Sequence, residues 1–116
     1  MNANSLSIVE SRNGDICVVT LSGRIDSTNA DDLIARLKKL ILAGEKSIIA
    51  DLGAVLFLTS VAFRAFLVIT DEAERNSAKF VLCNVLGSVR ELFELGGLID
   101  AFTIYGSREE ASTKLG

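Results

Sequence analysis

The hydroxyl groups of Thr59 and Ser60 are the side chains of this sequence best placed for chemistry. They follow an apolar run at residues 47–52 and precede a strongly apolar stretch from Val61, a pattern that predicts a strand, a short loop and a helix. The first N–H groups of a helix lack intrahelical partners and favour negative charge. Either hydroxyl is therefore expected to cap the helix or to accept a phosphate group there. Local sequence alone favours the cap, because caps are common.

The elements that would position these hydroxyls alternate between strands and helices. Strands are expected at residues 6–10, 16–21, 47–52, 79–83 and 101–105, and helices at residues 29–43, 59–75, 89–95 and 107–115. Polar helix caps are expected at Ser27 or Thr28, at Ser88 (with Glu91 completing a capping box) and at Ser107. Asn13-Gly14 between the first two strands indicates a hairpin. The order predicts a single α/β domain over residues 1–116, with a mostly parallel mixed sheet, an antiparallel N-terminal hairpin and about four helices.

The composition excludes several classes of function. The chain has no histidine, which removes the commonest general base and metal ligand, so we expect neither an enzyme nor a metal site. A formal net charge of -3, with scattered Lys and Arg residues, predicts no nucleic-acid partner. No apolar run approaches the roughly 18 residues that would span a membrane, and no glycine-rich loop indicates a nucleotide cofactor.

The N-terminal segment and the two cysteines indicate the cellular compartment in which the protein is expected. Residues 1–15 lack a basic region followed by an apolar block, so no signal peptide is expected. Cys17 and Cys83 are both flanked by apolar residues of predicted strands. They are interpreted as reduced core cysteines of a cytoplasmic protein, with a disulfide between adjacent strands as the less favoured alternative.

A partner-binding surface is expected around Thr59 and Ser60. Apolar residues point in nearly every direction around the following helix, so some should be exposed; the candidates are Val61, Phe63, Leu67 and Val68. Arg64, one turn after Ser60, could pair with a phosphate or be an ordinary solvated arginine. Arg24 and Asp26 should also lie near this loop, because the carboxyl ends of parallel strands share one edge. For Asp26, a turn or cap role is equally open.

Three segments in order resemble the STAS domain family, specifically bacterial anti-sigma-factor antagonists. They are the turn at residues 23–26 (GRID), the apolar strand followed by FLTSVAFRAFL, and residues 87–98 (GSVRELFELGGL). The resemblance implies an STAS fold and a serine at the start of the second helix that a partner serine kinase, itself the anti-sigma factor, phosphorylates. A metal-dependent phosphatase removes the phosphate, and the unphosphorylated form binds the kinase. By position the acceptor is Ser60, and Asp26 matches a family residue near the partner interface.

The sequence departs from the family motif around Ser60. Thr59 stands where the family has Asp, Val61 replaces Ser or Thr, Ala62 replaces Gly, and Arg64 occupies a position that usually holds a small residue. We therefore expect a phosphorylation switch at Ser60, and less so at Thr59, with a partner matched to this unusual surface. The alternative is a scaffold or subunit of a larger complex, stressosome-like or a lipid-transport component, in which the hydroxyl only caps the helix.

Overall fold

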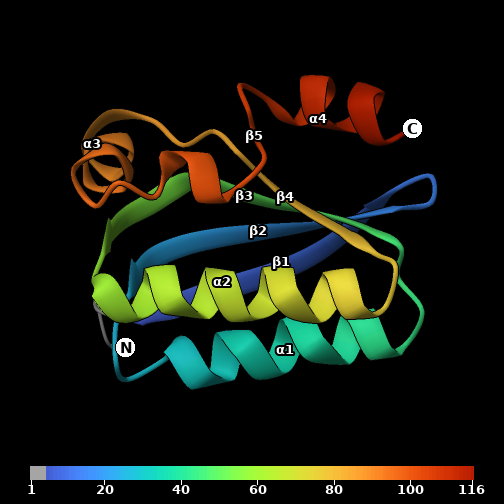
Figure 1. Ribbon diagram of the computed structural model, residues 1–116, viewed down its shortest axis with the longest axis horizontal. Helices are drawn as coiled ribbons and strands as arrows, with labels where there is room; N and C mark the ends of the chain where they lie inside the picture. The colour runs from blue at the N-terminus through green and yellow to red at the C-terminus, as the bar shows by residue number, and fades with distance from the viewer. Residues whose placement is uncertain (1–4) are drawn as a thin grey trace.

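The computed structural model, described here for residues 5–116, contains one five-stranded sheet in the order β1-β2-β3-β4-β5 (Figure 1). Its strands are β1 (Leu6–Asn13), β2 (Ile16–Ile25), β3 (Ser47–Leu58), β4 (Lys79–Cys83) and β5 (Ile104–Tyr105). Its helices are α1 (Ala30–Leu42), α2 (Ser60–Arg75), α3 (Gly87–Leu95) and α4 (Arg108–Leu115), with a single 3-10 turn, η1, at Ile99–Ala101. Only β1 runs antiparallel to its neighbour, which confirms the predicted mixed α/β fold.

The N-terminal hairpin forms at the predicted place, with Asn13 paired to Ile16 and Gly14 in the loop at φ 63°. A second glycine, Gly23, is required for a different reason. Its φ is 101°, and a Cβ at this position would lie 2.3 Å from the carbonyl oxygen of Ser5. The backbone of the chain before β1 therefore passes directly over Gly23, where any other residue would collide with it.

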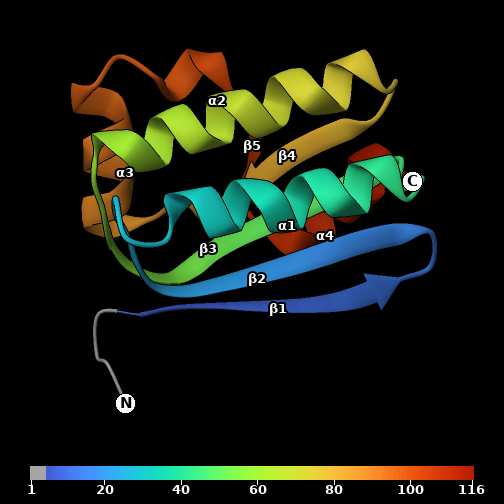
Figure 2. The ribbon, with the colours of Figure 1, turned by 90° about the horizontal axis from the view of Figure 1, so that it is seen from below.

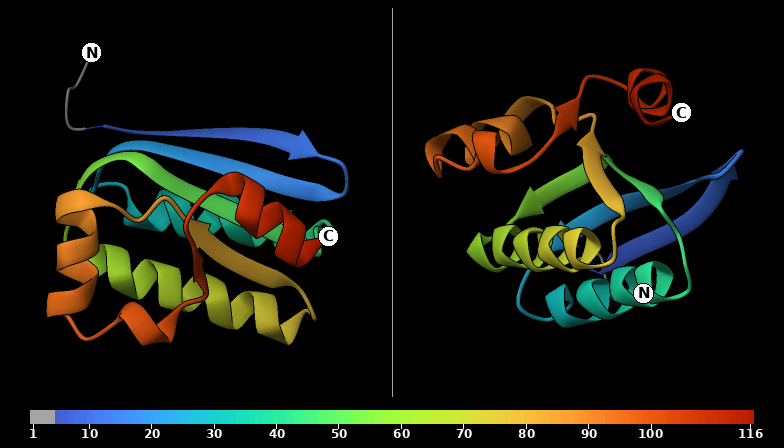
Figure 3. Two further views of the ribbon diagram at one scale, coloured as in Figure 1. Left: turned by 90° about the horizontal axis from the view of Figure 1, so that it is seen from above. Right: turned by 45° about the vertical axis from the view of Figure 1, so that its right-hand side comes forward.

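Helices cover the two faces of the sheet unequally (Figures 1 and 2). α1 and α2 lie side by side across one face, here called the helical face, and the main apolar core fills the space between. The other face, here called the back face, is covered by α4 over a smaller cluster of Ile16, Val18, Ile49, Val81, Cys83 and Ala111. α3 stands at the end of the sheet where β3 finishes, as both views of Figure 3 show. Cys17 and Cys83 are free thiols on opposite faces, on strands separated by β3, so the less favoured disulfide is wrong.

The predicted boundaries fail mainly at the ends of strands. β3 continues to Leu58, although a loop was expected after Leu52. Its pairing with β2 contains two register shifts. The final strand is only two residues long because the chain first forms η1. Ser107 caps α4 by accepting a hydrogen bond from the Glu110 N–H (3.1 Å). The other predicted caps are wrong, because Asn29 and Leu86 occupy these positions and form no side-chain cap.

Candidate functional site

The carboxyl ends of β2 and β3 bring the predicted site residues to one edge of the sheet. Arg24 pairs with Phe57 and Ile25 with Leu58 in the parallel register. Beyond the last pair, the Thr59 N–H donates to the Ile25 carbonyl oxygen at 3.1 Å. The loop that carries Asp26 and the start of α2 therefore adjoin, as the sequence predicted.

Neither hydroxyl at the start of α2 caps the helix. Thr59 holds the N-cap position in an extended conformation (φ -103°, ψ 177°), yet its side chain makes no capping bond, and its buried Oγ1 has no partner among residues 5–116. Its carbonyl oxygen accepts the first helical hydrogen bond, from the Ala62 N–H at 2.9 Å. Ser60 is the first helical residue and its side chain is exposed. The first turn of α2 holds no acidic residue, so its free N–H groups meet no negative side chain of that turn.

Asp26 has a clear local role in the neighbouring loop. Its carboxylate accepts hydrogen bonds from both the hydroxyl and the N–H of Thr28, and these bonds lower the pKa of Asp26. The Asn29 side chain ties the same loop together, accepting from the Asp26 N–H at 3.0 Å and donating to the Arg24 carbonyl oxygen at 2.9 Å. The carboxyl group thus shapes the turn that leads into α1, and it remains partly accessible to a partner.

The edge also presents apolar side chains that sequence reasoning missed. Leu56 is 71% exposed and Phe57 is 38% exposed. The Arg24 guanidinium carbon lies 4.7 Å from the centroid of the Phe57 ring, while its Nε is buried without a hydrogen-bond partner within residues 5–116. Because residues 53–58 were expected to be a loop, nothing in the pattern assigned a direction to Leu56 or Phe57.

The residues of the first turns of α2 divide between core and surface. Phe63 is only 9% exposed and packs edge-on against Phe93 with ring centroids 4.8 Å apart, so its predicted exposure to a partner is wrong. Leu67 is 40% exposed, Val61 is half-buried, and Arg64 is exposed and makes no ion pair within the described part of the chain. We therefore name the surface formed by Arg24, Leu56, Phe57, Ser60, Val61, Arg64 and Leu67 the α2 edge.

Across residues 5–116, no group of three or more His, Cys, Asp or Glu side chains is arranged to hold a metal ion. No helix in the same range is long and apolar enough to cross a bilayer. The α2 edge offers an exposed hydroxyl beside the free N–H groups at the start of α2, together with exposed apolar side chains and the cationic side chains of Arg24 and Arg64. Such a surface is suited to binding a protein.

The fold and this edge define a class of protein. The family model for the STAS domain matches residues 7–111, and the chain belongs to that family. Among named relatives, BtrV of Bordetella bronchiseptica, whose provisional name is anti-sigma factor antagonist, is 32% identical over 95 residues, or 82% of each chain.

Two solved structures illustrate the likeness. An anti-sigma factor antagonist from Mycobacterium paratuberculosis superposes with a TM-score of 0.86, at 23% identity over 97% of this chain and 96% of that one. SpoIIAA, a Bacillus cell fate determinant solved in its phosphorylated form, gives a TM-score of 0.72 at 20% identity, covering 95% of this chain and 100% of its own. At these identities the solved structures support the fold alone.

Proposed function

We propose that this protein is an anti-sigma factor antagonist that binds a serine kinase acting as the anti-sigma factor, and that phosphorylation of Ser60 switches the binding off. The observation that carries the proposal is the position of Ser60. Its exposed hydroxyl lies at the first residue of α2, next to a Thr59 that makes no side-chain cap, and Ser60 belongs to the α2 edge. Membership of a family with a relative named as an anti-sigma factor antagonist supports it.

The switch follows from charge and desolvation. In the unphosphorylated protein, the exposed side chains of Leu56, Phe57 and Leu67 offer apolar contact area on the same α2 edge as the small neutral hydroxyl. A phosphate would place roughly −1.5 to −2 charges at that point. The start of α2 tolerates this charge in the free protein, because its N–H groups and dipole favour an anion. Burying the charge beneath a partner costs free energy, so the complex dissociates while the fold persists.

The partners and location follow from the same proposal. The kinase would meet the α2 edge through its substrate-binding surface, and a metal-dependent serine phosphatase would restore the free hydroxyl. Both reactions belong in the cytoplasm, where sigma factors act. The protein itself contributes binding and an acceptor hydroxyl, with no catalytic role. Because Thr59, Val61, Ala62 and Arg64 differ from the family motif, the kinase should be one whose docking surface accommodates these side chains.

The decisive experiment measures phosphate transfer to Ser60. Purified protein is incubated with ATP and each candidate kinase of its host, and the modified peptide is located by mass spectrometry. A single added phosphate at Ser60 is expected, which Ser60→Ala abolishes and Thr59→Val leaves in place. Phosphate at another residue, or none with any of these kinases, would contradict the switch and favour the scaffold alternative.

A binding measurement tests the consequence of the modification. Ser60→Ala should keep the affinity for the kinase within about twofold, whereas Ser60→Asp should weaken it at least tenfold, or about 1.4 kcal/mol. Thermal unfolding of both variants provides the control, since an exposed helix-start position should change stability little. Equal affinity of the two variants would contradict the proposed mechanism of release.

A further inference from the structure

The sheet has an open edge that the proposed switch does not use. β5 pairs only with Leu82 and Cys83 of β4, so within residues 5–116 the first half of β4 has no strand on that side. The Lys79 N–H donates to the Lys46 carbonyl oxygen on the β3 side (2.8 Å), and the Leu82 N–H donates to the Thr103 carbonyl oxygen on the β5 side (2.9 Å). Backbone groups of successive residues in a strand point to opposite sides, so the N–H and C=O of Phe80 face the edge where no strand runs.

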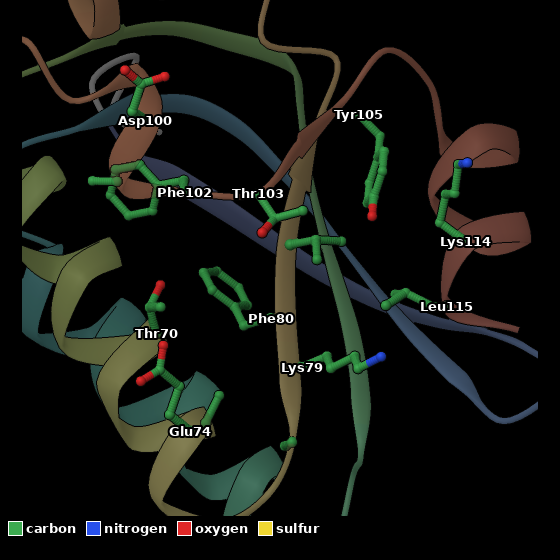
Figure 4. A pocket seen from close by; sticks show the side chains of 14 residues that line it. Thr70, Glu74, Lys79, Phe80, Asp100, Phe102, Thr103, Tyr105, Lys114 and Leu115 are labelled. Carbon is green, nitrogen blue, oxygen red and sulfur yellow. The ribbon is translucent and has the colours of Figure 1, made fainter.

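A cavity of about 410 Å³ follows this edge. Figure 4 shows Thr70 and Glu74 of α2 on one side of β4, and Tyr105, Lys114 and Leu115 on the other. The aromatic rings of Phe80 and Phe102 line the cavity on the α2 side. We call this cavity the β4 notch. It has the form of a vacant strand position, with α2 standing over one face and α4 over the other.

The charged side chains of the β4 notch also divide between the α2 face and the α4 face. Glu74 and Asp100 lie toward α2 and η1, whereas Lys79 and Lys114 lie toward α4 (Figure 4). All four side chains are exposed, and none makes an ion pair with another residue in the range 5–116. An extended peptide directs alternate side chains to opposite faces. A segment of alternating acidic and basic residues would therefore place its carboxylates against the lysines and its cations against Glu74 and Asp100.

We propose that the β4 notch binds an extended peptide segment of a partner protein, which adds a short strand beside Phe80. Main-chain hydrogen bonds to Phe80 would give affinity, and the two opposite rows of charge would select an alternating acidic and basic sequence. The notch borders the second half of α2, away from Ser60 at its first residue. This binding is consequently independent of the phosphorylation switch and could occur in either phosphorylation state.

A pair of peptides of identical composition tests the proposal. The probe is Ac-Val-Glu-Lys-Glu-Lys-Val-NH2, and the control is Ac-Val-Glu-Glu-Lys-Lys-Val-NH2, in which the charges no longer alternate. Each is titrated into the ¹⁵N-labelled full chain while amide shifts and hydrogen exchange are followed by NMR. The probe should shift the Phe80 amide and slow its exchange, and it should bind at least fivefold more tightly than the control.

Matched variants identify the charges involved. Lys114→Glu should weaken binding of the probe at least threefold, whereas Lys39→Glu, the same change on the exposed surface of α1, should leave it unchanged. Both positions are exposed, so neither variant should impair folding. The proposal is overturned if millimolar probe leaves the Phe80 amide unaffected, if the two peptides bind equally well, or if both variants weaken binding alike.

Discussion

The carboxylate of Asp51 in β3 and the guanidinium of Arg108 in α4 form an ion pair that attaches α4 to the back face of the sheet. The Asp51 side chain is 9% exposed, and its other oxygen accepts from the Gly53 N–H (2.9 Å) and the Asn84 side chain (3.1 Å). Arg108 also donates to the Thr20 hydroxyl. One carboxylate thus connects β3, the end of β4 and α4, and it does so in the strand that continues to the α2 edge.

Removing Asp51 should therefore destabilise the whole domain. Asp51→Ala removes a buried carboxylate and leaves three partly buried donors without an acceptor, so it should lower the free energy of unfolding by about 3 kcal/mol. Arg108→Ala should cost less, about 1–2 kcal/mol, because the arginine side chain is 40% exposed and water screens the pair. Urea denaturation measures both. The control is Arg75→Ala, which removes an exposed ion pair with Asp71 and should cost less than about 0.5 kcal/mol. If Asp51→Ala lowered stability no more than this control, the role of Asp51 in holding α4 to the sheet would be contradicted.

The same carboxyl group should make stability depend on acid pH. Burial acts to raise the pKa of Asp51, but the hydrogen bonds from Arg108, Gly53 and Asn84 outweigh it and lower the pKa. A carboxyl whose pKa is lower in the folded state stabilises fully above its unfolded pKa of about 3.9, and this stability is lost as pH falls through the folded value. Unfolding free energy should therefore fall below about pH 4 in the wild type.

Asp51→Asn isolates this contribution, because the amide does not titrate. The variant should be less stable at pH 7 and should lose less stability between pH 5 and pH 3 than the wild type does. Asp26→Asn is the comparison, since the Thr28 hydrogen bonds also lower the pKa of that partly exposed carboxyl. Urea unfolding at a series of pH values gives both slopes, and parallel curves for Asp51→Asn and wild type would refute the assignment.

The sequence predicts the order of elements well and the polar contacts across the molecule poorly. Apolar patterning places the four α-helices and the five strands, although it misses η1, because it reports which face of each segment is buried. The pairing of Asp51 with Arg108 spans 57 positions and depends on how α4 returns to the sheet, so no local pattern indicates it.

In the candidate site, too, the local sequence predicts the position of one residue and does not predict the burial or orientation of others. Ser60 lies at the helix start that its local pattern predicts. The burial of Phe63 against Phe93 depends on the position of α3, which the sequence around Phe63 does not encode. Leu56 and Phe57 lie in the part of β3 that is affected by two register shifts against β2. After such a shift, the alternation of apolar and polar residues no longer tells which face of the sheet a side chain is on.

The thiol of Cys83 should be unreactive until α4 moves. Cys83 is fully buried under α4, and burial raises its pKa to about 12. The thiolate is the reactive form, so reaction with a disulfide reagent at pH 8 should be limited by opening of the structure. In a Cys17→Ser background, which leaves Cys83 as the remaining cysteine, Arg108→Ala should speed the reaction at least threefold. Arg75→Ala should not change it, and equal rates in both would mean that α4 does not control access.

The α2 edge and the core beneath it should respond in opposite ways to truncation. Phe57→Ala removes an exposed ring and its contact with Arg24, so we expect the affinity for the kinase to fall about fivefold to thirtyfold, with little loss of stability. Phe63→Ala leaves a cavity against Phe93 and should lower the free energy of unfolding by about 3 kcal/mol. Calorimetric binding and urea denaturation of the same preparations separate the effects. Leu42→Ala, at an exposed residue of α1 outside the edge, provides the control. If Phe57→Ala binds the kinase as the wild type does, β3 does not contribute to the docking surface.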